Sequence, residues 1–250
     1  MPSLVPEEGE TLDRITGSWQ IFQLKKGQRF STDDSVTAWT AGRLRPDARR
    51  LADIGAGIGS VGLMTLHMVH PEATSVFLEV QERSHRLCRK TIALNALDHR
   101  VELRLGDLRD ADMLPESGSF DLVTGSPPYF PVQEGVVSDN PQRAGARMEL
   151  NGCVFDYCQT AARLMKPDAA LVFVHAAADP RPEKAIEAAG LILNQRQDVV
   201  FAAGRPPTIA VFSCSFSGTR SDAEPLVMRD AEGQYSPDRF MLKAAMGFEG

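Results

Sequence analysis

Apolar residues between positions 50 and 125 fall into four short runs rich in aliphatic, aromatic or β-branched side chains. The runs are LADI, TSVFLEV, VELRL and FDLVTG, at residues 51–54, 74–80, 101–105 and 120–125. Between them, residues 59–68 and 82–97 carry apolar side chains at helical spacing. Strands that alternate with helices predict βαβ units, and hence a parallel sheet covered by helices on both faces.

The same alternation continues to about residue 216. Helices are predicted near residues 154–165 and 182–189, and strands at 170–176, 191–201 and 208–216. The turn between the last two strands, GRPP at 204–207, is too short for a crossover helix, so we expect these strands to be antiparallel. The pattern predicts an α/β protein with a Rossmann-like, seven-stranded sheet that is mostly parallel and has an antiparallel last strand.

Two stretches lack this periodicity. Residues 130–147 contain Gly, Pro, Asp and Asn, which predicts a long loop, and loops of this length in compact domains are usually functional lids or disordered. Residues from 217 onward form a polar tail with one short helical candidate at 237–246. With 250 residues, 43% of them hydrophobic, we expect one domain over residues 1–250.

A glycine-rich sequence from Asp53 through Gly55 and Gly57 to Gly59 joins the first predicted strand to the first predicted helix. Glycine lets the backbone turn sharply and approach a ligand closely, because a Cβ would collide with that ligand. Gly57, Gly59 and Gly62 also fit the G-x-G-x-x-G pattern of dinucleotide sites. Asp53 argues against a dinucleotide, because a carboxylate there would repel a pyrophosphate. It suits a cofactor with a positive end, such as S-adenosylmethionine (SAM).

Acidic residues close the next two strands as well. Glu79 ends the second strand and can accept hydrogen bonds from the two ribose hydroxyls of an adenosine. Asp107 follows the third strand and can accept from an adenine amine, although Gly-Asp after a strand also serves as a simple cap. Ligands bind at the carboxyl ends of parallel strands, so Asp53, Glu79 and Asp107 together predict a SAM site.

The fourth strand is followed by Ser126-Pro127-Pro128-Tyr129-Phe130. Two consecutive prolines fix the backbone, so the turn can hold a side-chain oxygen and a main-chain carbonyl towards one point. Two such acceptors on the hydrogens of a planar amine make its nitrogen more nucleophilic. Tyr129 offers a flat face on which a planar substrate can stack. The loop therefore indicates methylation of an amine.

These motifs resemble those of the amino-methyltransferases with an N/D/S-P-P-Y/F sequence. More narrowly, the chain resembles the bacterial tRNA adenine-N6-methyltransferases that modify the adenine next to the anticodon of valine tRNA. Their Q-x-x-F-x-x-D start is matched in this chain at residues 28–34, although the spacing differs, and A-R-x-E is matched at 146–149. Their G-x-Y-[ST] segment is comparable to residues 233–236.

The resemblance implies roles for residues outside the glycine loop. Residues 1–49 would form an extension that contacts cofactor and substrate, with Thr32 and Asp33 at the methionine end of SAM. Residues 130–149 would form the lid loop, in which Arg147 faces substrate phosphate. The catalytic residues would be Ser126, Pro127 and Tyr129, and the base would also contact Pro128 and Phe130. Ser126 would border SAM as well, and no metal is expected.

One residue departs from the narrower family. Its members have Asn where this chain has Ser126, and Ser at this place resembles the DNA cytosine-N4 methyltransferases. A protein-glutamine methyltransferase is a further alternative, but that class carries an N-terminal helical domain for which residues 1–49 are too few. The Ser126 departure also leaves open a module that binds SAM or RNA without activity.

Charge and composition refine this prediction. The formal net charge of −6 argues against non-specific coating of nucleic acid, yet residues 14–50 contain eight basic and three acidic side chains. We expect this local excess, with Arg143 and Arg147, to form one positive face for tRNA at the mouth of the site. The four cysteines lack metal-ligand spacing. Without a signal sequence or a long apolar run, the protein is expected in the cytoplasm, off the membrane.

Overall fold

The structure, a computed structural model, describes residues 4–131 and 138–248. Its main sheet has eight strands in the order β10-β8-β9-β7-β6-β3-β4-β5. In chain order the strands are β3 (Arg50–Ile54), β4 (Thr74–Glu79), β5 (Val101–Leu105), β6 (Phe120–Gly125), β7 (Met165–Ala176), β8 (Ile192–Val200), β9 (Ile209–Ser215) and β10 (Ala223–Val227). The Rossmann-like α/β fold predicted from the sequence is confirmed.

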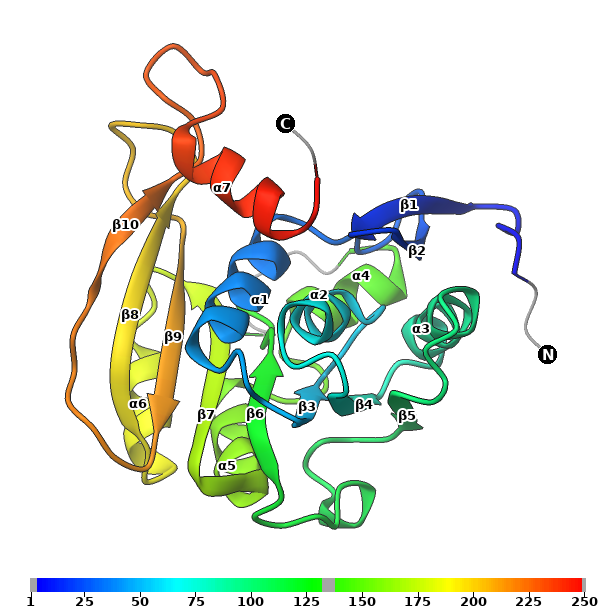
Figure 1. Ribbon diagram of the computed structural model, residues 1–250, viewed down its shortest axis with the longest axis horizontal. Helices are drawn as coiled ribbons and strands as arrows, with labels where there is room; N and C mark the ends of the chain where they lie inside the picture. Colours follow the sequence, from blue (N-terminus) through cyan, green and yellow to red (C-terminus); the bar gives the residue numbers. More distant parts are fainter. Residues whose placement is uncertain (1–3, 132–137, 249–250) are drawn as a thin grey trace.

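Helices cover both faces of the sheet (Figure 1), and an apolar layer lies between the sheet and the helices on each face. One layer lies under α1 (Thr32–Leu44), α2 (Ser60–Met68) and α3 (Glu82–Leu94). The other lies under α5 (Val154–Leu164) and α6 (Arg181–Ala188). Strands buried on both faces read as continuous apolar runs, which explains why these strands could be predicted from the sequence.

The predicted count of seven strands is wrong, because β10 adds an eighth at the edge of the sheet. It pairs in parallel with β8, whereas β9 is antiparallel to both β7 and β8, as expected for the last predicted pair. The sequence of β10, AEPLV, has a central proline and no apolar alternation. Edge strands tolerate proline, because one side of the strand needs no ladder hydrogen bonds.

A β-hairpin precedes the sheet and was not predicted. It consists of β1 (Glu10–Thr16) and β2 (Trp19–Leu24), joined at Gly17, whose φ is +50°. A Gly-Ser pair between two β-rich runs is a known hairpin signal, so the sequence contained the information.

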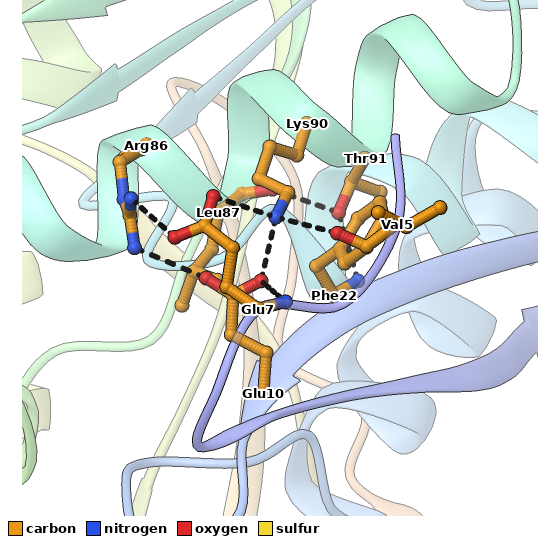
Figure 2. A network of polar contacts seen from close by, with 8 residues as sticks. All are labelled: Val5, Glu7, Glu10, Phe22, Arg86, Leu87, Lys90 and Thr91. Carbon is orange, nitrogen blue, oxygen red and sulfur yellow. Dashed lines mark hydrogen bonds and ion pairs between the residues drawn. The ribbon is translucent and has the colours of Figure 1, made fainter. Parts of the chain in front are cut away.

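A buried ion pair fastens this hairpin to α3 (Figure 2). Lys90 Nζ donates to Glu10 Oε2 at 2.6 Å, and both side chains are almost fully buried. The same nitrogen reaches Glu7 Oε1 at 3.3 Å and the carbonyl of Val5 at 3.1 Å. Arg86, one helical turn away, bonds Glu7 and Glu10 from the exposed side. The hairpin is therefore held by charge as well as by apolar packing.

Two short helices complete the rim at the carboxyl ends of the parallel strands (Figure 1). The first, α4 (Pro141–Arg147), interrupts the segment predicted as a loop; Asn140 caps it by accepting from the Arg143 N–H. The second, α7 (Pro237–Ala245), matches the helix predicted in the tail and packs on α1. A short 3₁₀ turn, η1 (Ala111–Met113), follows β5.

Candidate active site

Two neighbouring cavities open at the carboxyl ends of β3, β4 and β6. The larger cavity encloses about 890 Å³, part of it open to solvent, and borders the glycine loop. The smaller, of about 360 Å³, borders the Ser-Pro-Pro-Tyr loop. Four residues line both cavities: Gln28, Asp34, Ser126 and Ala146. Ser126 thus lies where the two cavities meet.

The glycine loop forms the floor of the larger cavity. Gly55, Gly57 and Gly59 all have positive φ, between +59° and +89°, a conformation that favours glycine. A Cβ on Gly57 would meet no atom within 4 Å and would project into open space. A Cβ on Gly55 would collide with the Tyr157 hydroxyl at 1.9 Å. Gly55 and Gly57 line the cavity, whereas Gly59 caps α2 and is not among the described residues that line it.

Asp53 lies under this loop, almost completely buried. Its carboxylate accepts from the Gly62 N–H at 2.9 Å and from the Thr124 hydroxyl at 2.7 Å. Burial raises its pKa to about 7, against the effect of these two hydrogen bonds. The side chain therefore ties β3 to β6 and α2, and its charge is not balanced by a cation among the described residues.

Glu79 ends β4 on the opposite wall of the larger cavity. One carboxylate oxygen accepts from the Gly57 N–H and the other from the Gln81 N–H, both at 2.7 Å. Burial raises the pKa of Glu79 above its ordinary value. Glu79 thereby fixes the glycine loop and retains lone pairs with which to accept from a ligand.

Asp34 is a site residue to which the sequence analysis gave no role. It accepts from the Ser31 N–H at 2.7 Å and from the Ser60 hydroxyl at 2.9 Å, which links the start of α1 to the start of α2. Removal from water and the neighbouring Asp33 charge raise the pKa of Asp34 to about 6. The capping pattern of residues 31–34 was visible in the sequence, but its position between two cavities was not.

Thr32 and Asp33 are the residues that the resemblance assigns to the methionine end of the cofactor. Asp33 lines the smaller cavity, and Thr32 is not among the described residues that line either one. Asp107 pairs with Arg109 at 2.5 Å and is likewise not among the lining residues, although its neighbours Gly106 and Leu108 are. The cofactor roles assigned to these residues stay predictions.

The Ser-Pro-Pro-Tyr loop is held firmly in place. The Tyr129 hydroxyl donates to Asp33 Oδ2 at 2.9 Å, and the Tyr129 carbonyl accepts from Arg181 at 3.1 Å. The ring centroid of His175 lies 5.1 Å from that of Tyr129, with the rings tilted by 54°. Burial lowers the pKa of His175 to about 4, so the imidazole beside Tyr129 is neutral at pH 7. Pro127 and Tyr129 line the smaller cavity, and Pro128 lines the larger.

The base of the expected lid is closed by a short bridge. The Phe130 N–H donates to the Arg147 carbonyl, and the Glu149 N–H donates to the Phe130 carbonyl. Arg181 joins both ends, because it bonds Glu149 at 2.6 Å as well as the Tyr129 carbonyl. Phe130 is 47% exposed, and Arg147 lines the smaller cavity. The lid prediction also covers residues 132–137, which lie outside the described residues.

Further residues of the site come from distant parts of the chain. Gln142, on α4, accepts from the Gln28 N–H at 2.6 Å and donates to Ser84 at 3.1 Å. Tyr157, on α5, closes the floor below Gly55 and Gly125. Neither belongs to a motif, so no sequence signal pointed to them.

The basic residues of positions 14–50 do not form one face, which corrects the sequence expectation. Helix α1 begins at the site and runs about 20 Å to the opposite edge of the sheet. There Arg45 bonds the Asp168 carbonyl and Arg50 pairs with Glu116, alongside Arg43 and Arg49. Near the cavities, Arg29 lines the larger one but is paired with Asp13.

Within residues 4–131 and 138–248, no group of three or more His, Cys, Asp or Glu side chains is arranged to hold a metal ion. None of the described helices is both long enough and apolar enough to span a bilayer.

The fold and the site define a SAM-dependent methyltransferase. Residues 30–155, just over half of the chain, match the methyltransferase small domain family. The chain belongs to this family. The glycine loop, with Glu79 on the wall and space above Gly57, fits the cofactor expected for that class.

Several proteins of known sequence or structure are similar to this chain, and those compared below are described as methyltransferases. The protein named tRNA1(Val) (adenine(37)-N6)-methyltransferase in Tolumonas auensis is 24% identical over 226 residues, 90% of this chain and 92% of its own. Its namesake in Shewanella putrefaciens is 31% identical over 131 residues, 52% of each chain. The crystal structure of a protein described as a predicted O-methyltransferase, from Agrobacterium tumefaciens, shares the fold with a TM-score of 0.65 at 18% identity. The match covers 87% of this chain and 98% of that one.

Proposed function

We propose that this protein transfers the methyl group of SAM to the exocyclic amine of a nucleobase, adenine N6 in tRNA. The observation that carries the proposal is the position of Ser126, at the junction of a cofactor-sized cavity and a second cavity that contains Tyr129. The names of the relatives from T. auensis and S. putrefaciens support tRNA and adenine as substrate.

The larger cavity would hold SAM. Glu79 would accept from the ribose hydroxyls, over a floor of Gly55 and Gly57. Asp53 would add negative potential from below the loop. Asp34, rather than its neighbours Thr32 and Asp33, would face the positively charged methionine end, because it is the member of the three that lines this cavity. Asp107 would accept from the adenine amine if its pairing with Arg109 yields.

The smaller cavity would receive the target base. A base there would stack on Tyr129, whose ring is fixed by the Asp33 bond and by His175. Phe130 would border the base, and Arg147 would face a phosphate next to it; Pro128 lines the larger cavity, so it would meet the base only where the two cavities join. These contacts require the base to leave its stack in the RNA, as in other enzymes that act on base amines.

Ser126 Oγ and the Pro127 carbonyl would accept hydrogen bonds from the amine and direct its lone pair towards the larger cavity. Bound SAM supplies a methyl group on a sulfonium sulfur, so the new N–C bond forms as the C–S bond breaks. The amine must then release a proton. Among the described residues, Asp34 is the titratable group that lines both cavities, and with a pKa of about 6 it is ionised at pH 7.

The first experiment is to incubate the protein with labelled SAM and total tRNA and then to digest the RNA to nucleosides. We expect label in N6-methyladenosine. The Ser126 departure favours one alternative, cytosine N4, which would place the label in N4-methylcytidine instead. Label in protein and none in RNA would overturn the proposal.

A second experiment tests the loop. Ser126→Ala should lower turnover and leave SAM affinity unchanged, because it removes an acceptor that acts on the developing positive charge. If the substrate is adenine, Ser126→Asn should retain or raise the methylation activity. If the substrate is cytosine, the same substitution should impair methyl transfer. An Ala variant as fast as the parent would exclude the role given to Ser126.

Tyr129→Ala should weaken RNA binding by about 1–3 kcal/mol, the usual contribution of base stacking on an aromatic side chain. Tyr129→Phe is the matched control, since it keeps the ring and removes only the bond to Asp33. We expect Phe to recover most of the affinity in a titration of RNA; equal losses in both variants would instead assign the effect to the hydroxyl.

A further inference from the structure

Three basic side chains gather around the exposed ring of Tyr235, near the C-terminal end of the described chain. The charged groups of Arg229, Lys243 and Arg239 lie 4.6, 5.3 and 5.8 Å from the ring centroid. Phe240 meets the ring edge-on, with a centroid distance of 6.2 Å. Tyr235 is 42% and Phe240 48% exposed. We name these five residues the Tyr235 surface.

Within the described residues, the cations of this surface are not ion-paired, although three acidic residues, Asp230, Glu232 and Asp238, lie close to them in the sequence. Arg229 bonds the Gly233 carbonyl and Arg239 reaches the Thr32 hydroxyl; neither they nor Lys243 forms an ion pair in the described part of the chain. Arg181, by contrast, is paired with Asp179 and Glu149. Three unpaired cations close together on a protein of net charge −6 form a local site for a polyanion.

The surface adjoins the smaller cavity. Arg239 Nη1 lies 3.4 Å from Thr32 Oγ1, and the next residue, Asp33, bonds the Tyr129 hydroxyl inside that cavity. Figure 1 shows α7 crossing beside α1 on the side of the molecule that also carries α4. A strand whose target base enters the smaller cavity could therefore continue directly onto α7.

We propose that the Tyr235 surface binds the RNA strand that flanks the target nucleotide. Arg229, Arg239 and Lys243 contact its phosphates, and Phe240 or Tyr235 stacks on an unpaired base. The exposed aromatic rings favour RNA over an acidic peptide, because a peptide of carboxylates would use the cations and leave the rings without partners. This inference rests on the proposed function and adds where the RNA lies.

The test compares two charge reversals of equal size. The first double variant, Arg229→Glu with Lys243→Glu, alters the Tyr235 surface. The control pair, Arg49→Glu with Lys184→Glu, alters two exposed side chains, one in the loop before β3 and one on α6. We expect the first pair to weaken tRNA binding by at least about tenfold. The slope of log affinity against log salt should fall by roughly 0.7 for each lost contact to single-stranded phosphate. The control pair should stay within about twofold of the parent.

Two further measurements complete the design. SAM affinity, measured by calorimetry, should be unchanged in all variants, which shows that the altered chains are folded. Phe240→Ala should lower RNA affinity by about tenfold, and Phe240→Tyr, which keeps a ring, should not. An acidic peptide of glutamates should not displace RNA from the parent at equal concentration, and displacement would overturn the assignment to RNA.

Failure of this inference differs from failure of the proposed function. If the parent methylates tRNA and the Tyr235-surface variants bind it as tightly as the control pair, the surface is not an RNA site. If the parent methylates no RNA, the proposed function fails and the assignment of RNA to this surface fails with it.

Discussion

Two groups of buried carboxylates in this protein differ in what surrounds them. At the hairpin, Glu10 is buried against Lys90, and the two opposite charges lie 2.6 Å apart. At the glycine loop, Asp53 and Glu79 are equally buried but accept only from N–H and hydroxyl groups, and the partly buried Asp34 does the same. No cation pairs with these three acids among the described residues.

This difference distinguishes carboxylates that hold the fold together from carboxylates that can bind a ligand. A buried charge with a partner has completed its interactions, so its role is to hold elements together. A buried carboxylate without a cation keeps an unfavourable energy in the free protein, seen in the raised pKa of Asp34, Asp53 and Glu79. A ligand with a positive end relieves that energy, and SAM carries both a sulfonium and an amino group.

The largest expected effect is on the free energy of unfolding, and it comes from breaking the buried ion pair between Lys90 and Glu10. Lys90→Met should destabilise the protein by about 3–5 kcal/mol, because Glu10 would remain buried without its main partner. Urea denaturation measures this loss. The control, Arg86→Met, removes the half-exposed cation of the same network and should cost about 1 kcal/mol or less. Equal losses would mean that burial does not distinguish the two cations.

The second effect, on binding, is expected at the unbalanced acids. Glu79→Gln should weaken SAM binding by about 1–3 kcal/mol, since it removes charge-assisted hydrogen bonds to the ribose. Glu79→Gln should lower the stability of the ligand-free protein by less than Lys90→Met does, because no ion pair is broken. Calorimetry and denaturation of the same variant separate the two quantities. Tight NAD binding by the parent would contradict the whole assignment of this cavity.

A smaller effect concerns pH. The folded pKa of Asp53, about 7, lies above its ordinary value, so the folded protein retains a proton that the unfolded chain has lost. The stability contributed by protonated Asp53 is therefore lost as pH rises towards 7. Relative to the parent, Asp53→Asn should gain about 1–2 kcal/mol in the free energy of unfolding between pH 5 and 7. Saturating SAM should reduce that gain, because the ligand favours the ionised form.

The sequence predicted the parts of this fold that follow from local pattern. Strands β3, β4 and β6 are continuous apolar runs, and residues placed at their ends, such as Asp53, Glu79 and Ser126, meet at one edge because parallel strands share a direction. The hairpin was missed although its Gly-Ser turn is a local signal, and β10 was missed because its position depends on pairing with β8 rather than on its own periodicity.

The rest of the site depends on packing between distant segments. Gln142 reaches Gln28 across 114 residues, and nothing in either local sequence indicates that contact. Asp34 and Asp33 have nearly the same sequence context, yet Asp34 lines both cavities and Asp33 lines only the smaller one, because successive helical residues point in different directions. Such one-residue distinctions require the three-dimensional arrangement.

The contact between the hairpin turn and the end of α7 has a consequence for synthesis. The Gly17 N–H donates to the Met246 carbonyl at 2.8 Å, and the Thr16 hydroxyl reaches the same carbonyl across 230 residues of chain. During translation, the hairpin turn emerges 230 residues before its partner. The contact that joins the hairpin to α7 at the rim of the site therefore forms only after residue 246 has left the ribosome, so a shorter nascent chain lacks it.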